Sequence, residues 1–298
     1  MKHLEPSLFL HLKLRILAMK NQLTILAAVL SLLVIASCKQ PLSPSSRGGD
    51  NNLPLDVFPV SEFPSLGTWH DSLVAFVKAE WNPNASYATW AHPAIDSLAG
   101  FVIDYINDSL SAPLGTDVLR AADIDSLAVM VNMPSSEWIN YLAGEWDSDE
   151  TSTYAGSIDS VERHLIDTMV SYCVATQSVS TPGIYDSLIN EANHLLSTFN
   201  SYTWTDTTGD LAAGGLYILL ASAQYHKTYG RTYQKGAIPQ FIEEAAAEDA
   251  IAYAIGYFAE ESDEIRAGGG NSVNPRKCNK RGLEDAGKMS LLALLIPF

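Results

Sequence analysis

The sequence predicts an all-α protein, an irregular bundle of about eight helices that follows a signal peptide and a flexible tether. Three observations support this fold class. Apolar residues recur at helical spacing through most of residues 57–267. The breaks between these stretches are rich in Pro, Gly, Asn and Ser, and strand-like alternation is rare. We therefore expect helices packed on helices around one core.

Four helices are expected in the first half of this domain. Trp69, Leu73 and Val77 share one face of a helix over about residues 68–80. The next helix begins near Pro93, which suits a first turn, and ends at the Pro-Leu-Gly sequence of residues 113–115. A short helix is expected over 123–131 and another over about 134–146, before a polar stretch at 147–153 that is a candidate subdomain boundary.

Four longer helices are expected after this break. The first is capped by Ser157 and continues to about Tyr172, and the second runs from Thr181-Pro182 to Phe199. A largely apolar helix follows Gly209-Asp210, and the last one runs from Pro239 to about Ile265. Residues 268–298 are expected to be a Gly-rich, basic tail whose apolar end docks on the domain or on a partner.

The N-terminal region has the layout of a secretory signal. Fourteen almost wholly apolar residues, 23–36, follow Lys20 and end in Ile35-Ala36-Ser37-Cys38. At about 1.5 Å per residue this run covers roughly 21 Å, less than the ~30 Å of a bilayer core. We therefore interpret residues 1–37 as a cleaved signal peptide, with Met19 a better start than Met1.

The residues around the cut site resemble the lipobox of bacterial lipoproteins. This resemblance implies that the sulfur of Cys38 receives a lipid and that Cys38 becomes the new N-terminus. Residues 38–56, rich in Pro, Ser, Gly and Asn, are expected to be a flexible linker. In bacterial lipoproteins, a residue other than Asp after the lipidated cysteine is typical of those sorted to the outer membrane. Lys39 at this position therefore favours an outer-membrane location in the cell envelope.

The charge balance restricts the partners of the domain. Removal of residues 1–37 leaves 14 Lys and Arg against 33 Asp and Glu, a formal charge of −19. Such an acidic surface repels phosphate backbones and anionic headgroups, so we expect no nucleic-acid partner and membrane contact through the lipid on Cys38 alone. The basic residues near the C-terminus are expected to pair within the domain rather than touch headgroups, and they are Arg276, Lys277, Lys280, Arg281 and Lys288.

Two cysteines remain besides Cys38, and their state is open. Cys173 and Cys278 could form a disulfide in an oxidising compartment, and the loop that they close would be long. Cys173 also lies in an apolar helical pattern, which fits a buried free thiol equally well.

Two carboxylate–histidine pairs are low-ranking candidates for metal binding. His164 and Asp167 share a helical face, as do Glu191 and His194. Glu-x-x-His is half of a ferritin-type di-iron signature, but that signature needs the motif on two helices and two further glutamates. We therefore expect helix-surface pairs and neither a metal site nor a cofactor.

The sequence Trp69-His70-Asp71-Ser72 places the residue types of a hydrolytic triad together. Neighbouring helical residues point about 100° apart, so these three are not expected to converge. The chain has no Gly-x-Ser-x-Gly elbow, His-Glu-x-x-His motif, Walker loop or dinucleotide fingerprint. No catalytic residue is assigned on this basis, although a triad assembled from distant residues remains open.

The tryptophans offer one candidate for ligand binding. Trp69 and Trp138 lie on apolar stripes and are expected in the core, whereas Trp81, Trp90 and Trp146 lie at expected helix ends. Tryptophans at such positions could stack on sugar rings. An envelope protein or a glycan is therefore a candidate partner.

Two short segments carry a family resemblance. Residues 66–73, Leu-Gly-Thr-Trp-His-Asp-Ser-Leu, resemble the Gly-x-x-His-Asn-x-x-Leu segment of certain uncharacterised Bacteroidota lipoprotein-like proteins. The later Ala-Asp-Ala-x-x-Ala segment of those proteins is similar to residues 248–254 here. Asp71 replaces the expected Asn, and the resemblance implies no activity and no catalytic residue.

We therefore expect a lipid-anchored envelope protein that acts by binding rather than by catalysis. The alternative is an envelope hydrolase or metal-dependent enzyme that uses some of His70, His164 and His194 with neighbouring carboxylates. An enzyme should bring two or more of these groups together in a cleft. A binding module should leave them dispersed.

Overall fold

Every regular element in the described part of the chain is a helix. The computed structural model describes residues 60–80, 93–116, 118–119, 133, 137–150, 158–177, 183–204, 208–229, 240–268 and 273–295. Helices account for 88% of these residues, with nine α-helices and no strand among them, which confirms the predicted all-α fold. The elements are η1 (Val60–Glu62), α2 (Phe63–Glu80), α3 (Pro93–Ser109), α4 (Ser111–Leu114), α6 (Trp138–Glu150), α7 (Ser160–Thr176), α8 (Ile184–Phe199), α9 (Asp210–Tyr229), α10 (Gln240–Gly268) and α11 (Pro275–Leu295).

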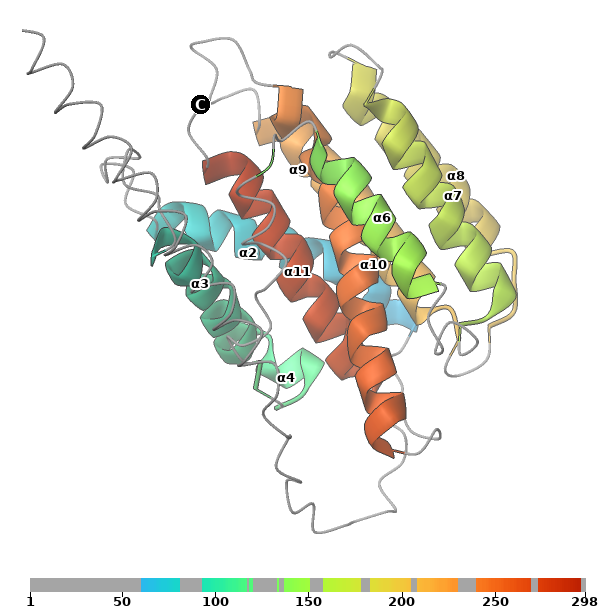
Figure 1. The fold of residues 1–298 in the computed structure, drawn as a ribbon, viewed down its shortest axis with the longest axis horizontal. Helices are drawn as coiled ribbons and strands as arrows, with labels where there is room; N and C mark the ends of the chain where they lie inside the picture. The colour runs from blue at the N-terminus through green and yellow to red at the C-terminus, as the bar shows by residue number, and fades with distance from the viewer. Residues whose placement is uncertain are drawn as a thin grey trace, which may run out of the picture. The chain divides into compact units, whose positions relative to one another are not determined.

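Helices α10 and α11 pack along each other and form the centre of the bundle, orange and red in Figure 1. From Ala245 to Phe258, α10 is buried on nearly all sides, because its small residues let neighbouring helices approach from several directions. At Gly282 of α11, a Cβ atom would lie 2.7 Å from the ring of Tyr253 and 2.9 Å from its carbonyl oxygen. The two backbones therefore approach each other as closely as only glycine allows.

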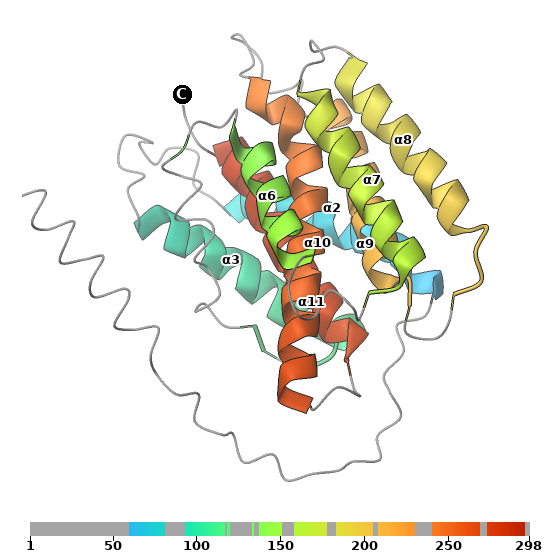
Figure 2. The same cartoon turned by 45° about the vertical axis from the view of Figure 1, so that its right-hand side comes forward.

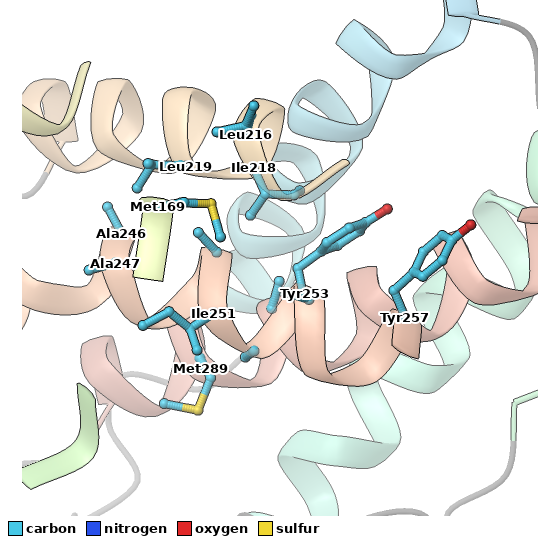
Figure 3. Close-up of a cluster of buried hydrophobic side chains, with 14 of the residues drawn as sticks. Met169, Leu216, Ile218, Leu219, Ala246, Ala247, Ile251, Tyr253, Tyr257 and Met289 are labelled. Atoms are coloured by element: carbon cyan, nitrogen blue, oxygen red, sulfur yellow. The ribbon is translucent and has the colours of Figure 1, made fainter. Parts of the chain in front are cut away.

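The remaining helices surround this pair. Helix α9 packs on α10, α2 and α8, and α6 packs on α10. Helices α7 and α8 lie side by side, and α3 contacts α2 and α11 (Figures 1 and 2). The apolar side chains between α7, α9, α10 and α11 form a continuous core, part of which is shown in Figure 3.

Local sequence accounts for the helices at the edge. The stripe of α8 predicted from sequence is buried at Ile184, Leu188, Leu195 and Leu196. Helix α7 begins at a different cap from the one expected. Asp159, and not Ser157, is its N-cap, and the Asp159 carboxylate accepts a hydrogen bond from the backbone N–H of Val161 at 2.8 Å.

The basic residues of α11 pair inside the domain, as the sequence predicts. Lys277 binds Glu260 and lies 3.2 Å from Glu264, and Lys288 binds the buried Glu284. Arg276 and Arg281 have carboxylate partners as well, with the closest N···O distances at 3.9 and 3.3 Å. Lys280 is buried. A helix with a polar sequence is therefore accommodated in the interior through ion pairs.

Two expectations about the domain limits differ from the structure. Residues 275–295 are a central helix rather than a tail, because their charges are paired and their small residues fit α10. Both sides of the break at 147–153 belong to one compact unit, residues 54–298. The signal peptide, Cys38, the linker to residue 56 and the expected helix at 123–131 lie outside the described residues.

Cys173 and Cys278 are both buried free thiols, so the structure supports the second of the two states left open. Within the described ranges, no helix combines the length and the apolar character that a membrane span requires.

Candidate functional site

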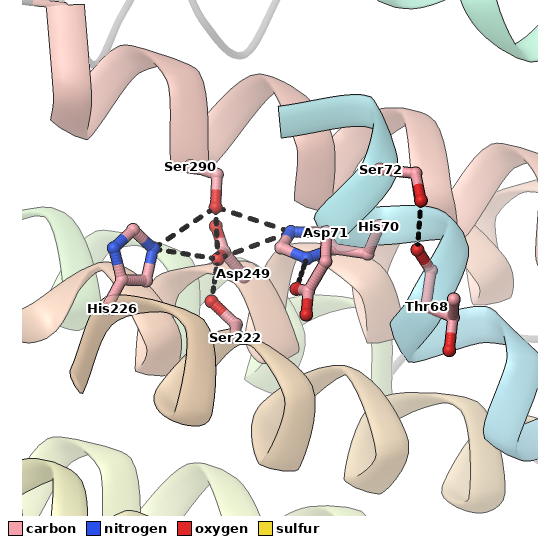
Figure 4. Close-up of polar contacts among 8 residues, drawn as sticks. All are labelled: Thr68, His70, Asp71, Ser72, Ser222, His226, Asp249 and Ser290. Carbon is pink, nitrogen blue, oxygen red and sulfur yellow. Dashed lines mark hydrogen bonds and ion pairs between the residues drawn. The ribbon is translucent and has the colours of Figure 1, made fainter. Parts of the chain in front are cut away.

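A group of polar side chains lies inside the bundle where four helices meet (Figure 4). We call it the Asp249 cluster. Helix α2 contributes His70 and Asp71, α9 contributes Ser222 and His226, α10 contributes Asp249, and α11 contributes Ser290. All of these side chains except Asp71 belong to residues with 0% exposure. Because burial of polar groups is costly without partners, such a cluster requires an explanation.

Helical spacing positions the members of the cluster. Ser222 and His226 are one turn apart on α9, so both face the same side of that helix. Asp249 lies in the all-round buried part of α10, where any polar side chain must find its partners among neighbouring helices. Residues from the N-terminal and C-terminal parts of the domain thus converge on one carboxylate.

The cluster is centred on one oxygen atom. Asp249 Oδ2 accepts hydrogen bonds from the hydroxyls of Ser222 and Ser290, the second at 2.5 Å. His70 Nε2 lies 3.4 Å from the same oxygen and His226 Nε2 lies 3.8 Å from it. Ser290 Oγ lies between the two rings, 3.3 Å from His70 Nε2 and 3.4 Å from His226 Nε2.

The other carboxylate oxygen of Asp249 and the other ring nitrogen of His226 lack hydrogen bonds. Asp249 Oδ1 and His226 Nδ1 are buried and form no hydrogen bond with any of the described residues. The donors are therefore concentrated on Oδ2, and the carboxylate is bound asymmetrically.

His70 and Asp249 form an ion pair in this setting. Burial alone favours neutral His70, but the hydrogen bonds and charges of Asp249 and Asp71 outweigh it and raise the pKa of His70 to about 9. Burial also disfavours the Asp249 anion, yet hydrogen bonds and charges from His226 and His70 lower the pKa of Asp249 to about 2. At neutral pH, His70 is therefore a cation and Asp249 an anion.

Three members of the cluster have the connectivity of a Ser-His-Asp triad. Ser290 Oγ is 3.3 Å from His70 Nε2, and Asp71 Oδ1 is 3.3 Å from His70 Nδ1. The proton of Ser290 is donated to Asp249, however, and a protonated His70 cannot accept it as a general base. In this arrangement, the three residues do not form a working nucleophile.

Residues 69–72 differ in one respect from the expectation that neighbouring helical side chains do not converge. The imidazole of His70 is long enough for Nδ1 to reach Asp71. Ser72 does not participate, because its hydroxyl donates to the carbonyl oxygen of Thr68 at 2.8 Å (Figure 4).

The four low-ranking metal candidates lie elsewhere. His164 and His194 are exposed on α7 and α8, and Glu191 is half-buried. Asp167 accepts a hydrogen bond from the indole N–H of Trp146 at 2.9 Å. Across the described residues, no group of three or more His, Cys, Asp or Glu side chains could hold a metal ion.

The tryptophans offer little surface for a sugar. Trp146 is 1% exposed, and Trp81 and Trp90 lie outside the described residues. The Trp204 ring stacks on Phe199 at 4.7 Å and packs closely against Gly209. Trp138 is buried in the core, as expected, and Trp69 is half-buried and packs against the core.

Four members of the cluster were not identified from sequence: Ser222, His226, Asp249 and Ser290. A sequence signal exists for Ser222 and Asp249, which stand among apolar and small residues, but not for His226, whose neighbours include Gln224 and Lys227. The two segments that carry the family resemblance also meet here, since His70 lies in one and Asp249 in the other. Segments far apart in the chain thus form one structural unit.

Comparison with known proteins adds no assignment to the cluster. The chain matches no protein-family model, no curated protein and no solved structure. The chemistry of the site is therefore interpreted from its geometry alone.

Proposed function

We propose that the protein is a lipid-anchored interaction module of the cell envelope, attached to the outer membrane through Cys38. The apolar run that ends in Ile35-Ala36-Ser37-Cys38 supports the anchor. Lys39, in place of an Asp after the cysteine, supports the choice of membrane. The helical domain would then work at the end of the linker formed by residues 38–56.

Binding is favoured over catalysis because the Asp249 cluster is enclosed. His70, Asp249 and Ser290 are each 0% exposed, and their hydrogen-bonding groups are directed at one another. A catalytic group must meet its substrate, whereas a structural ion pair must be shielded from water. The cluster therefore joins four helices, and the function belongs to the outer surface.

The charges on that surface favour a basic partner. Exposed carboxylates are spread over several helices: Asp104, Asp108, Glu137, Glu145, Asp147, Asp186 and Asp263. Lys227 and Arg266 also reach the surface, and each pairs with a carboxylate. An acidic exterior of this kind attracts a basic surface on another envelope protein. It gives less support to a glycan, because the described tryptophans are mostly packed inside.

Labelling with a palmitate analogue tests the anchor. Cells that express the wild-type protein should show a labelled, membrane-associated product, and the Cys38→Ala variant should be unlabelled and released from the membrane. Cys278→Ala is the matched control and should label like the wild type. Equal labelling of the wild type and Cys38→Ala would exclude lipidation at this residue.

Sedimentation with insoluble peptidoglycan tests the class of partner. The Cys38→Ala protein should remain in the supernatant at low and at high salt, because neither its charge nor its described tryptophans favour a sugar polymer. Co-sedimentation that persists at high salt would replace the protein partner with a glycan.

A serine hydrolase is the second candidate function, favoured by the contacts that link Ser290, His70 and Asp71. A fluorophosphonate probe distinguishes it from the first. We expect no labelling of the folded protein, because Ser290 is enclosed and its proton is held by Asp249. Labelling that disappears in Ser290→Ala and persists in Ser72→Ala would establish the hydrolase.

A further inference from the structure

A second buried polar group lies where α7 meets the start of α9. Glu162 of α7 is 5% exposed, and its Oε1 accepts a hydrogen bond from the backbone N–H of Ala212 at 3.1 Å. The N–H groups of Gly209 and Leu211 also interact with this carboxylate. The first N–H groups of a helix have no partners within the helix, so Glu162 caps α9 from outside.

Asp210 is a second carboxyl group at the same place. It is the first residue of α9 and is only 6% exposed. Its Oδ2 atom is buried and has no hydrogen-bond partner among the described residues. A buried oxygen without a partner is costly as an anion, whereas a proton on this carboxyl group would remove the charge.

The groups that act on this pair are acidic or neutral. The charge of Asp159, the N-cap of α7, raises the pKa of Glu162. The charge of Glu261 on α10 raises the pKa of Asp210. Tyr253 and Tyr257 of α10, labelled in Figure 3, face the same region, and the charges of Glu162 and Asp210 contribute to raising the pKa of both phenols. The pair therefore lies in surroundings that disfavour two negative charges.

The two carboxyl groups titrate near neutral pH as a result. Burial raises the pKa of Glu162 to about 7, although the N–H groups of α9 partly offset it. Burial, followed by the charges of Glu162 and Glu261, raises the pKa of Asp210 to about 8.

We propose that Glu162 and Asp210 form a proton-operated clasp between α7 and the N-terminal turn of α9. With a proton on the pair, Glu162 holds the first N–H groups of α9. When both groups are ionised, they repel each other and Glu261, and the junction loosens. The Asp249 cluster lies near the other end of α9, so the loosening is local to the first turn of α9 and the start of α7.

Hydrogen exchange measured on the full chain tests the clasp. Amide protection at Leu211, Ala212 and Ala213, corrected for intrinsic exchange rates, should fall at least about tenfold between pH 6 and pH 9. In Asp210→Asn, which cannot ionise at this position, protection should be nearly constant over this range. Asp263→Asn, an exposed carboxylate on α10, is the matched control and should behave like the wild type.

Trp204 provides a second readout, since its ring packs against Gly209 at the same junction. Its fluorescence, obtained by subtracting that of Trp204→Phe, should change between pH 6 and pH 9 in the wild type. The change should be absent in both Asp210→Asn and Glu162→Gln. Protection and fluorescence that are independent of pH in the wild type, or equally dependent in these two variants, would overturn the proposal.

Discussion

His70 of α2 and Asp249 of α10 form an ion pair with no solvent exposure, with Nε2 of His70 3.4 Å from Oδ2 of Asp249. The pair joins a helix near the start of the domain to its most buried helix. Two hydroxyls and a second histidine complete its surroundings. The pair affects stability because the loss of either partner leaves the other as a buried charge with fewer partners.

Asp249→Asn should destabilise the protein strongly. The change preserves the size of the side chain but removes the buried partner of the His70 cation and leaves it with the part-exposed Asp71. Removing one partner of a buried ion pair costs about 3–5 kcal/mol in the free energy of unfolding. Urea denaturation followed by circular dichroism would measure it. Asp263→Asn, at a side chain with 66% exposure, should change stability by less than about 0.5 kcal/mol. A loss below about 1 kcal/mol in Asp249→Asn would show that the ion pair contributes little.

The same pair predicts a loss of stability in alkaline solution. The pKa of His70 is about 9 when folded and 6.5 when unfolded, so the stabilisation is complete below pH 6.5 and is lost as the pH rises through 9. A shift of this size corresponds to about 3 kcal/mol. Asp249, whose pKa is lowered from 3.8 to about 2, contributes stability above pH 3.8 that is lost as the pH falls through 2.

Unfolding at a series of pH values tests this prediction, with His70→Gln as the informative variant. Glu162 and Asp210 act in the same direction at lower pH, because their pKa values are raised from 4.5 and 3.8 to about 7 and 8. Their contribution to stability is complete below pH 3.8 and is lost as the pH rises through 7 and 8. His70→Gln should therefore retain the decline that Glu162 and Asp210 cause up to about pH 8 and lose the part that His70 adds between pH 6.5 and 9. An unchanged profile in His70→Gln would contradict the assignment to His70.

Gly282→Ala should destabilise the contact between α10 and α11. Its Cβ would lie 2.7 Å from the ring of Tyr253 and 2.9 Å from the carbonyl oxygen, and a backbone atom cannot move aside as a flexible side chain can. Overpacking of this kind costs about 1–3 kcal/mol. Gly144→Ala in α6 is the control, since nothing lies within 4 Å of its added Cβ. It should be neutral or stabilise by up to about 1 kcal/mol, and thermal denaturation would compare the two.

The two buried cysteines should be unreactive in the folded protein and free in the unfolded one. Burial raises the pKa of Cys173 to about 12 and also raises the pKa of Cys278, so neither is a thiolate at neutral pH. Titration of Cys38→Ala with a thiol reagent should find almost no reaction before denaturation and two thiols after it. No thiols after denaturation would indicate a disulfide instead.

The ends of several helices could be predicted well from sequence, since the residues that favour a helix end act locally. Pro93 does begin α3, α8 does end at Phe199, and α9 does begin at Asp210, each near a residue that favours a helix end. Helix α11 was missed because its Lys and Arg residues indicate a solvated tail. Their partners include Glu62 and Glu260, and no local pattern shows that distant charges will meet.

The candidate site was only partly predictable for the same reason. His70 was singled out because it stands beside Asp71, a neighbour in the chain. Asp249 and Ser290 become significant only when α10 and α11 are placed against α2, and side-chain type alone does not indicate that placement. Ser222 and Asp249, polar residues among apolar and small ones, are the one local sign of the site.

The position of Ser290 and Asp249 in the chain also determines when folding can be completed. Helix α2 comes early in the chain, but the partners of His70 lie on α9, α10 and α11, the last of which follows at residues 275–295. Without α11, Asp249 lacks the hydrogen bond from Ser290 and the buried face of α10 lacks its main neighbour. The domain therefore closes only when the chain is present as far as α11, with contacts of long sequence separation formed last.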